Sequence, residues 1–256
     1  YGCGDPSRYV KKGDVVLDLG SGSGKICYMA AQLVGDNGKV IGVDMNDDML
    51  ALSRKYQQEM AQKLGSNRVE FVKGQIQDLA LDLTAMNTHL AEHPIYKAED
   101  IIALRAWQEK QRKNAPLIAD NSVDLVVSNC VLNLVHDSDK EQLVQEIFRV
   151  VKPGGRVAIS DIVSDELVPA HLKQNQALWS GCISGALQEH EFLQAFIKVG
   201  FVAVSYDKWE SQPWQVVEGL EFRSVTITAV KPKNEVNLFK SLFIIIFSVY
   251  LVLSFS

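Results

Sequence analysis

The sequence predicts an α/β fold in which a mostly parallel sheet of seven strands carries helices on both faces. Short apolar runs alternate with longer segments whose apolar residues recur at helical spacing, which is typical of a parallel sheet covered by crossover helices. Glycines and one Lys-Pro-Gly-Gly turn separate these segments. The 256 residues can bury one large hydrophobic core. We therefore expect one domain over residues 1–232, followed by an apolar tail at 233–256.

The first part of the chain is predicted to form three strands separated by two helices. The first helix ends at Gly35, and the second begins at a cap provided by Asn46 or Asp47 and ends at Gly65. The strands are expected at residues 15–20, 39–44 and 69–74, and the helices at 25–34 and 46–64.

The second part of the chain continues the alternation and then departs from it. A strand, a helix, a turn (KPGG) and another strand are expected at residues 123–129, about 139–151, 152–155 and 156–162. Two later segments, 201–209 and 222–230, alternate apolar and polar residues and have no helix between them. We therefore expect them to form an antiparallel pair at the edge of the sheet.

Residues 84–120 form an insertion between the third and fourth strands. Apolar residues recur every three positions between Pro94 and Pro116, which predicts an amphipathic helix over about 97–113. Two interpretations are open: a flap without a functional role, or a lid over the mouth of the substrate site.

The last residues, 241–256, are strongly apolar. As a helix they would extend about 24 Å, which is shorter than the roughly 30 Å hydrocarbon core of a bilayer. Three interpretations are open: a tail anchor that gives membrane contact through residues 238–256, a segment packed on this chain or on a partner, and a non-native end.

Charge and cysteine content limit the class of protein. The chain has 26 basic and 31 acidic residues and a net charge of −5, which is not the electrostatic pattern of a nucleic-acid-binding protein. A small-molecule substrate is expected instead. Four scattered cysteines are too few for a disulfide framework, so we expect a cytoplasmic protein with reduced thiols.

A glycine loop follows the first strand in the sequence DLGSGSG at residues 18–24. A strand, a glycine loop and a helix in this order form the ligand-binding crevice of doubly wound folds. The spacing excludes two phosphate-binding motifs. A dinucleotide fingerprint would need glycine in place of Lys25, and a P-loop would need glycine at Leu19 and serine or threonine at Ile26.

The GxGxG pattern resembles motif I of the class I methyltransferases, which have a Rossmann-like fold. The resemblance implies that this loop cradles the methionyl part of S-adenosylmethionine, the methyl donor. Asp44 ends the second strand, 24 residues after Gly20, where a carboxylate can accept hydrogen bonds from both ribose hydroxyls. The alternative for Asp44 is a cap on the next helix. The donor-binding residues implied are Asp18, Gly20, Ser21, Gly22, Gly24, Asp44 and Asn129.

Two further segments match the same family. The turn after the third strand, at residues 74–79, lies against the adenine edge in these enzymes, which implies contacts from Gln75, Ile76 and Gln77. Met45 and Met49 are candidates to pack on the adenine, although methionines at this spacing also occur in cores. The KPGG turn matches the family as well.

Three of the four cysteines lie where topology can bring them near the donor. Cys130 follows the fourth strand and Cys182 comes after the fifth, and the carboxyl ends of parallel strands form one ligand-binding edge. Cys3 precedes the first strand and could fold over that edge. A single cysteine is more often a small buried hydrophobe, and this is the interpretation of Cys27.

The segments that contain these three cysteines resemble the arsenite methyltransferases, and in particular the bacterial form associated with arsenosugar synthesis. They are YGCG, SNCVLNLV and LWSGCISGA, and the resemblance covers residues 1–232. It implies that Cys3, Cys130 and Cys182 bind trivalent arsenic as thiolates, a soft centre held by soft ligands. The arsenic lone pair would attack the methyl group, so the transfer needs no general base.

The resemblance also implies partners. They are arsenite or its thiol conjugates, with glutathione or thioredoxin as reductant. Two alternatives to an arsenite methyltransferase stay open. One is a small-molecule C- or O-methyltransferase with incidental cysteines, and the other is a non-catalytic module that binds the donor or arsenic.

Overall fold

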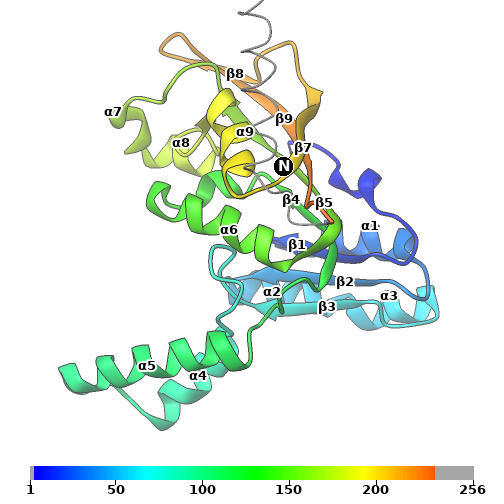
Figure 1. Cartoon of the computed structure of the whole chain (residues 1–256), viewed down its shortest axis with the longest axis vertical. Helices are drawn as coiled ribbons and strands as arrows, with labels where there is room; N and C mark the ends of the chain where they lie inside the picture. The colour runs from blue at the N-terminus through cyan, green and yellow to red at the C-terminus, as the bar shows by residue number, and fades with distance from the viewer. Residues whose placement is uncertain (1–2, 234–256) are drawn as a thin grey trace, which may run out of the picture.

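One twisted sheet forms the centre of the molecule in the computed structural model, which describes residues 3–233 (Figure 1). Its main path follows the order β3-β2-β1-β4-β5-β9-β7, which confirms the seven predicted strands. Those strands are β1 (Val15–Leu19), β2 (Lys39–Asp44), β3 (Val69–Lys73), β4 (Val123–Asn129), β5 (Val151–Ser164), β7 (Val202–Trp209) and β9 (Leu220–Val230). The five strands from β3 to β5 are parallel. The predicted antiparallel pair is also confirmed, and β9 lies between β5 and β7, antiparallel to both.

Two short strands were not expected. β6 (Leu187–Gln188) extends the sheet beside the end of β5, and β8 (Gln215–Val217) forms a hairpin with β9. Strands of two or three residues are too short to show a period in the sequence.

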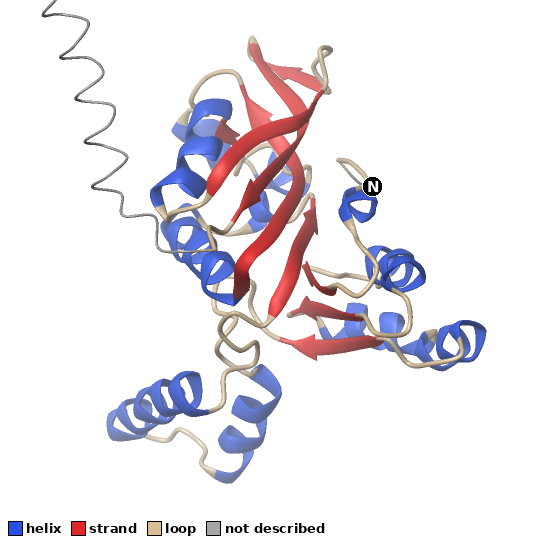
Figure 2. Cartoon of the chain, turned by 45° about the vertical axis from the view of Figure 1, so that its right-hand side comes forward, coloured by secondary structure: helices blue, strands red, loops and turns tan. Residues whose placement is uncertain are grey.

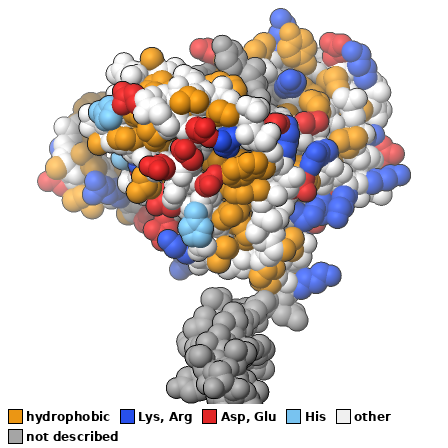
Figure 3. Space-filling model, turned by 90° about the horizontal axis from the view of Figure 1, so that it is seen from above, with side chains coloured by type: hydrophobic (Ala, Val, Ile, Leu, Met, Phe, Trp, Pro, Cys, Tyr) orange, Lys and Arg blue, Asp and Glu red, His pale blue; other side chains and the backbone are white. Residues whose placement is uncertain are grey.

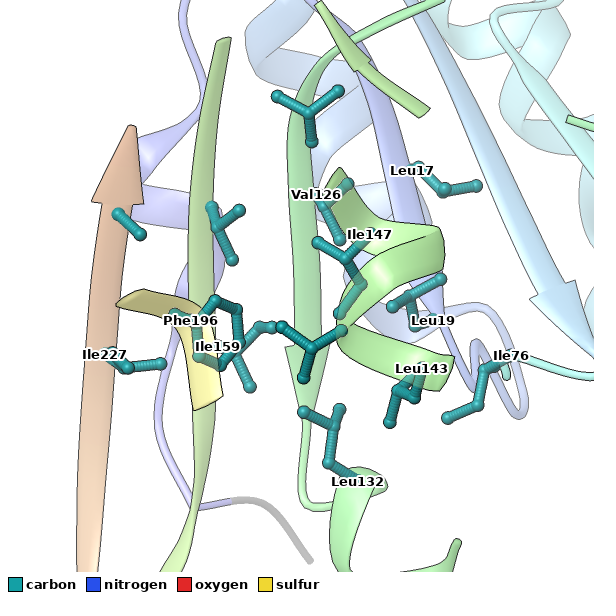
Figure 4. Close-up of a cluster of buried hydrophobic side chains, with 14 of the residues drawn as sticks. Leu17, Leu19, Ile76, Val126, Leu132, Leu143, Ile147, Ile159, Phe196 and Ile227 are labelled. Carbon is teal, nitrogen blue, oxygen red and sulfur yellow. The ribbon is translucent and has the colours of Figure 1, made fainter. Parts of the chain in front are cut away.

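Helices cover both faces of the sheet, as predicted (Figure 2). One face carries α1 (Lys25–Val34), α2 (Asp47–Lys55) and α3 (Gln57–Leu64), and the other carries α6 (Lys140–Val150) and α9 (Glu189–Lys198). Successive side chains of β1 serve the two faces, because side chains alternate along a strand. Val16 packs in the cluster that contains Cys27, and Leu17 packs in the cluster that contains Ile147 (Figure 4).

The prediction of a single long helix over residues 46–64 is wrong in one respect. The helix is interrupted at Tyr56, which separates α2 from α3. The physical reason is a competing hydrogen bond. The Tyr28 hydroxyl donates to the Ser53 carbonyl, which is the acceptor that the amide of Gln57 would use in a continuous helix. The predicted start is confirmed, and Asn46 rather than Asp47 is the cap, since its side chain accepts from two amides of the first turn.

The predicted KPGG turn lies within β5 rather than before it. Val151 already pairs with Val123, and regular pairing resumes at Arg156 with Leu125, so residues 152–155 form a bulge. Gly154 has a φ of +82°, which glycine adopts without steric cost.

The insertion is a pair of helices rather than one. α4 (Leu83–Glu92) and α5 (Ala98–Asn114) form a hairpin that projects from the end of the molecule beyond β3 (Figures 1 and 2). α5 confirms the predicted helix, and α4 was not expected. Neither helix contains a fully buried residue, so the hairpin adds little to the main core.

The apolar tail lies outside the described residues, apart from Lys233 at its start, and its three interpretations stay open. Among the helices of residues 3–233, none has the length and apolar character needed to cross a bilayer. Seen from the end that carries β8 and α7 (Ala170–Lys173), the surface intersperses acidic, basic and hydrophobic side chains (Figure 3).

Candidate functional site

The glycine loop after β1 depends on its glycines for two different reasons. Gly20, Gly22 and Gly24 have φ values of +69°, +52° and +82°, a region that other residues rarely adopt. A side chain at Gly20 would collide with Val131, and one at Gly24 would collide with Phe71. A Cβ at Gly22 would meet no atom within 4 Å, so this glycine faces open space.

Asp44 links the loop to the end of β2. Its Oδ2 accepts a hydrogen bond of 2.8 Å from the Gly22 amide, and its Oδ1 accepts one of 2.9 Å from the Asn46 amide. Asp44 therefore braces the entry to α2 but is not the cap of that helix. A carboxylate has about four acceptor positions, so it keeps capacity for hydroxyl donors from a ligand.

A cavity of about 600 Å³ opens beside the loop, and its walls include Asp18, Ser21, Lys25 and Asn129. Asp18 is fully buried, and burial raises the pKa of its carboxyl to about 7, although a hydrogen bond from the Cys27 thiol (3.2 Å) opposes the shift. No ion pair joins Asp18 to a cation within residues 3–233. The buried hydroxyl of Ser21 also has no hydrogen-bond partner.

These unsatisfied groups suit a ligand that is cationic and polar. A buried carboxylate without a counter-ion is stabilised when a cation binds beside it. S-adenosylmethionine carries a sulfonium and an ammonium group. The residues of this cavity therefore fit the donor that the sequence implied.

The predicted adenine contacts lie at the neighbouring strand ends. Met45 and Met49 are 59% and 40% exposed, so neither is a core residue. Ile76 is only 7% exposed and packs in the core cluster under α6 (Figure 4). Gln75 and Gln77 are half-buried on either side of it. The exposed methionines and the two glutamines thus leave more surface for a ligand than Ile76 does.

The three predicted thiols converge on one cavity of about 910 Å³. Cys3 and Cys130 are joined by a disulfide, with their Cα atoms 5.7 Å apart. The expectation of reduced thiols is therefore wrong for this pair, because the fold brings together two cysteines that are 127 residues apart in the sequence, whereas Cys27 and Cys182 are free. The Cys182 thiol donates a hydrogen bond of 3.2 Å to the Cys130 carbonyl. Cys27, in contrast, is fully buried in the cluster under α1 and is not among the residues that line this cavity.

Asn129 and Ser224 hold Cys3 in place, although it lies near the start of the described chain. The Asn129 side chain accepts from the Cys3 amide (2.7 Å) and donates to the Gly4 carbonyl (2.9 Å). The Ser224 hydroxyl donates to the Cys3 carbonyl. Gly4 packs against Ser160, and a Cβ added to Gly4 would lie 2.5 Å from the Ser160 Oγ.

A buried carboxylate, Asp161, lies among the thiols and was not predicted. One of its oxygens is within 4.8 Å of the sulfurs of Cys3 and Cys130. Burial raises its pKa to about 6, and backbone amides, that of Ile162 first, oppose the shift. Burial also raises the pKa of the Cys182 thiol to about 12, and the charge of Asp161 adds to this. The sequence did contain a signal for Asp161, because this residue stands near the carboxyl end of β5, at the same edge of the sheet as Asn129.

The far wall of the thiol cavity comes from the antiparallel part of the sheet. It includes four residues for which no motif gave a signal: Lys208, Glu210, Gln212 and Trp214. They belong to β7 and to the segment that leads into β8, which the sequence indicated only as edge structure.

The donor cavity and the thiol cavity adjoin. Gly4, Asp5 and Asn129 line both of them. A group bound at the thiols and a methyl group bound by the glycine loop would therefore face each other across Asn129. This arrangement can position an acceptor in line with a methyl donor, which is the main requirement of a displacement reaction.

Comparisons with known proteins show the family to which this chain belongs. The family model for a methyltransferase domain matches residues 10–96 and 108–200. An arsenite methyltransferase of Aquipseudomonas alcaligenes is 36% identical over 202 residues, which cover 78% of this chain and 48% of that protein. The human arsenite methyltransferase is 34% identical over 203 residues, 78% of this chain and 44% of that protein. The chain spans about half the length of these curated relatives.

A solved structure shows the same similarity in three dimensions. The arsenic(III) S-adenosylmethionine methyltransferase of Chlamydomonas reinhardtii superposes with a TM-score of 0.70 at 30% identity. The match covers 92% of this chain and 69% of that one. The resemblance seen in the sequence is confirmed, and the chain belongs to the methyltransferase domain family, in the part of it that contains the arsenite methyltransferases.

Proposed function

We propose that this chain transfers a methyl group from S-adenosylmethionine to trivalent arsenic, in arsenite and in methylarsenite. The observation that carries the proposal is the shared wall between the two cavities. Cys3, Cys130 and Cys182 line one cavity, the glycine loop lines the other, and Asn129 lines both.

The donor supplies an electrophilic methyl group on a sulfonium, and the chain supplies the groups that hold it. Asp18 gives a buried negative charge, and Asp44 gives acceptors for the ribose hydroxyls. Gly20, Ser21, Gly22 and Gly24 allow close approach of the backbone. Met45, Met49, Gln75, Ile76 and Gln77 form the adenine side.

The thiols hold the acceptor. The Cys3–Cys130 disulfide must first be reduced, and two equivalents of a thiol such as glutathione, or one dithiol such as thioredoxin, supply the two electrons and two protons. Three thiols then replace the three hydroxyls of arsenous acid, and each thiol proton leaves with a hydroxyl as water. The raised pKa of Cys182 is therefore no obstacle, because arsenic binding itself removes the proton.

The remaining features are part of the same proposal. The catalytic domain comprises residues 1–232 with the helical insertion at 84–120, and residues 233–256 form a separate tail that provides membrane contact if it is an anchor. Reduced thiols suit the cytoplasm. A C- or O-methyltransferase is disfavoured because it would leave three convergent cysteines and Asp161 without a role, and a non-catalytic module is disfavoured because donor and acceptor cavities adjoin.

A turnover assay tests the proposal. The chain is incubated with arsenite, glutathione and S-adenosylmethionine labelled in the methyl group, and methylated arsenic is quantified. In each transfer the arsenic lone pair forms the bond to the methyl carbon, S-adenosylhomocysteine leaves, and arsenic goes from the trivalent to the pentavalent state. Two equivalents of glutathione supply the two electrons that return it to the trivalent state before the next transfer. Label in monomethyl- and dimethylarsenic is the expected result. A chain that binds the donor but leaves arsenic unlabelled would support another acceptor. A chain that binds arsenic or donor without any turnover would support the non-catalytic module.

A further inference from the structure

The helical insertion contacts the chain segment that is proposed to hold the adenine. The Arg112 side chain of α5 reaches back to Asp78, with its Nη2 2.9 Å and its Nε 3.1 Å from one carboxylate oxygen and its Nε 3.3 Å from the other. Asp78 is 8% exposed. The hydrogen bond to Asp78 is the main reason that the pKa of Arg112 is raised. Arg112 is also held by Glu109, one turn earlier on the same helix, at 2.7 Å.

A second contact fixes the other end of the same segment. Leu117 lies where the chain returns from the hairpin, and its side chain packs directly on Gly74. A Cβ added to Gly74 would lie 2.5 Å from the Cδ2 of Leu117. The amides of Leu117 and Ile118 donate to the carbonyls of Ala80 and Leu79, at 3.1 and 2.9 Å. The insertion therefore contacts residues 74–80 at both ends.

The segment between these contacts carries Gln75, Ile76 and Gln77. It is closed into a turn by the Asp78 amide, which donates to the Gln75 carbonyl at 3.1 Å. Its first residue, Gly74, donates to the Asp44 carbonyl at 3.1 Å. A displacement of Asp78 would thus reach both the turn proposed to hold the adenine and Asp44, which is proposed to hold the ribose.

The lid interpretation of the insertion does not fit this arrangement. No residue of 84–120 lines the thiol cavity, whose walls come from the N-terminal segment, the loops after β4 and α8 (Gln176–Ser180), and the antiparallel strands. The hairpin lies at the other end of the molecule from α8 (Figure 1).

We propose that the α4–α5 hairpin is a brace for the donor-binding turn and that Arg112 is a positioning residue for S-adenosylmethionine, acting through Asp78. The inference rests on the proposed donor site but not on the identity of the acceptor. Loss of the Arg112 guanidinium leaves the buried Asp78 carboxylate without its cation, so the turn rearranges to hydrate it. The bound donor is otherwise unchanged, so the effect falls on donor binding and not on the methyl-transfer step.

The test compares Arg112→Gln with Arg105→Gln. Arg105 lies two turns earlier on α5, is exposed, and makes no ion pair with any described residue. Donor Kd is measured by calorimetry, and the KM for donor and kcat are measured in the methylation assay. Arg112→Gln is expected to weaken donor binding and raise KM about tenfold with kcat nearly unchanged. Arg105→Gln is expected to match the unaltered chain.

Asp78→Asn in the Arg112→Gln background provides a rescue. It removes the unpaired charge, so it should restore part of the donor affinity. The proposal is overturned if Arg112→Gln lowers the melting temperature but leaves donor Kd within twofold, since that is a purely structural role. It is also overturned if kcat falls while KM stays the same. If the unaltered chain binds no donor, the proposed function and this inference are both refuted. If it binds donor but methylates no arsenic, only the proposed acceptor is refuted, and donor Kd still tests the role of Arg112.

Discussion

Cys130 and Cys182 both have backbones in the left-handed region, with φ values of +58° and +61°. A residue with a Cβ has an energetic cost of about 1–2 kcal/mol there, and such residues concentrate at functional sites. Neighbours hold each one: the Cys130 amide donates to the Ser160 carbonyl at 2.8 Å, and the Cys182 carbonyl accepts from Asn133 at 3.0 Å. Glycine would relieve the strain at both positions but would offer no sulfur.

Substitution of these thiols should separate acceptor chemistry from donor binding. Cys130→Ser and Cys182→Ser are expected to abolish arsenic methylation, because a hydroxyl is a hard ligand that stays protonated at neutral pH. Cys3→Ser should retain methylation of methylarsenite, which needs only two thiols. Labelled methylarsenic products report activity, and calorimetry should show unchanged donor affinity in all three variants. Full arsenite turnover by Cys182→Ser would refute its role as a ligand.

Asp18 should make both stability and donor binding depend on pH. Its pKa of about 7 in the folded chain lies above the ordinary value of 3.8, so the folded state binds this proton more tightly than the unfolded state. This contribution to the free energy of unfolding is present below about pH 4 and is lost as the pH rises to about 7. Asp18→Asn should therefore stabilise the ligand-free chain at pH 8 by at least about 1 kcal/mol.

The same substitution should weaken donor binding, because the cationic donor loses its buried counter-ion. In the unaltered chain, donor affinity is expected to increase as the pH rises through 7, and in Asp18→Asn this dependence should disappear. Calorimetry between pH 6 and 8 measures both. Glu166→Gln, at an exposed carboxyl with no ion pair in the described part of the chain, is the control. Donor affinity that is flat across this range in the unaltered chain would exclude Asp18 as the counter-ion.

Among the elements, the glycine loop allows a test matched for backbone strain. Gly22 and Gly65 both have positive φ and open space around a Cβ, but only Gly22 lines the donor cavity. Gly22→Ala and Gly65→Ala should each cost about 1 kcal/mol of stability, measured by chemical denaturation. Only Gly22→Ala should lose donor affinity, and Gly22→Val should abolish donor binding. Equal donor affinity in the two alanine variants would show that the donor does not approach Gly22.

The elements also show where prediction from sequence reaches its limit. The seven strands of the main path and the starts of α1, α2, α5 and α6 follow from local periodicity and capping, as at Asn46, and they were predicted to within a few residues, except that β5 begins earlier. The helices α4, α7, α8 and α9 and the strands β6 and β8 were not predicted. The break at Tyr56 was not predictable, because it depends on the hydroxyl of Tyr28 from another helix. Trp214 joins the thiol cavity through hairpin geometry, which no local pattern encodes. Asp161, in contrast, was missed although its place near the carboxyl end of β5 was a signal.

At the scale of the whole molecule, the two halves of the sheet have different tasks. The parallel half ends in the glycine loop and Asn129, which line the donor cavity, and in Asp44, which accepts a hydrogen bond from the Gly22 amide of that loop. The antiparallel half contributes Lys208 from β7 and Ser224 from β9 to the thiol cavity. The long central strand β5 joins the halves and carries Asp161 between them. The order of strands thus places the donor cavity and the thiol cavity side by side, with Gly4, Asp5 and Asn129 lining both.

This division predicts how much of the chain the chemistry needs. Lys231, which follows β9, anchors the end of the domain, since its Nζ donates to the Phe148 carbonyl at 2.6 Å and lies 4.5 Å from the centre of that ring. A chain shortened to end at Lys233 should keep its melting temperature and donor Kd, because it retains every residue that lines either cavity. A chain shortened to end at Ser224 is the control, and it should fail to fold because it lacks the buried Val225 and Ile227.

Calorimetry and thermal unfolding of the two shortened chains measure these outcomes. Loss of the folding transition in the chain that ends at Lys233 would mean that residues 234–256 pack on the domain, and the proposed boundary would be wrong. Sedimentation with vesicles distinguishes the remaining interpretations of the tail. If the full chain sediments with vesicles and the shortened chain does not, the tail is an anchor. If removal of the tail changes neither the folding transition nor sedimentation with vesicles, the tail neither packs on the domain nor acts as an anchor. Donor binding should persist in that case, because the residues proposed to hold donor and acceptor all precede the tail.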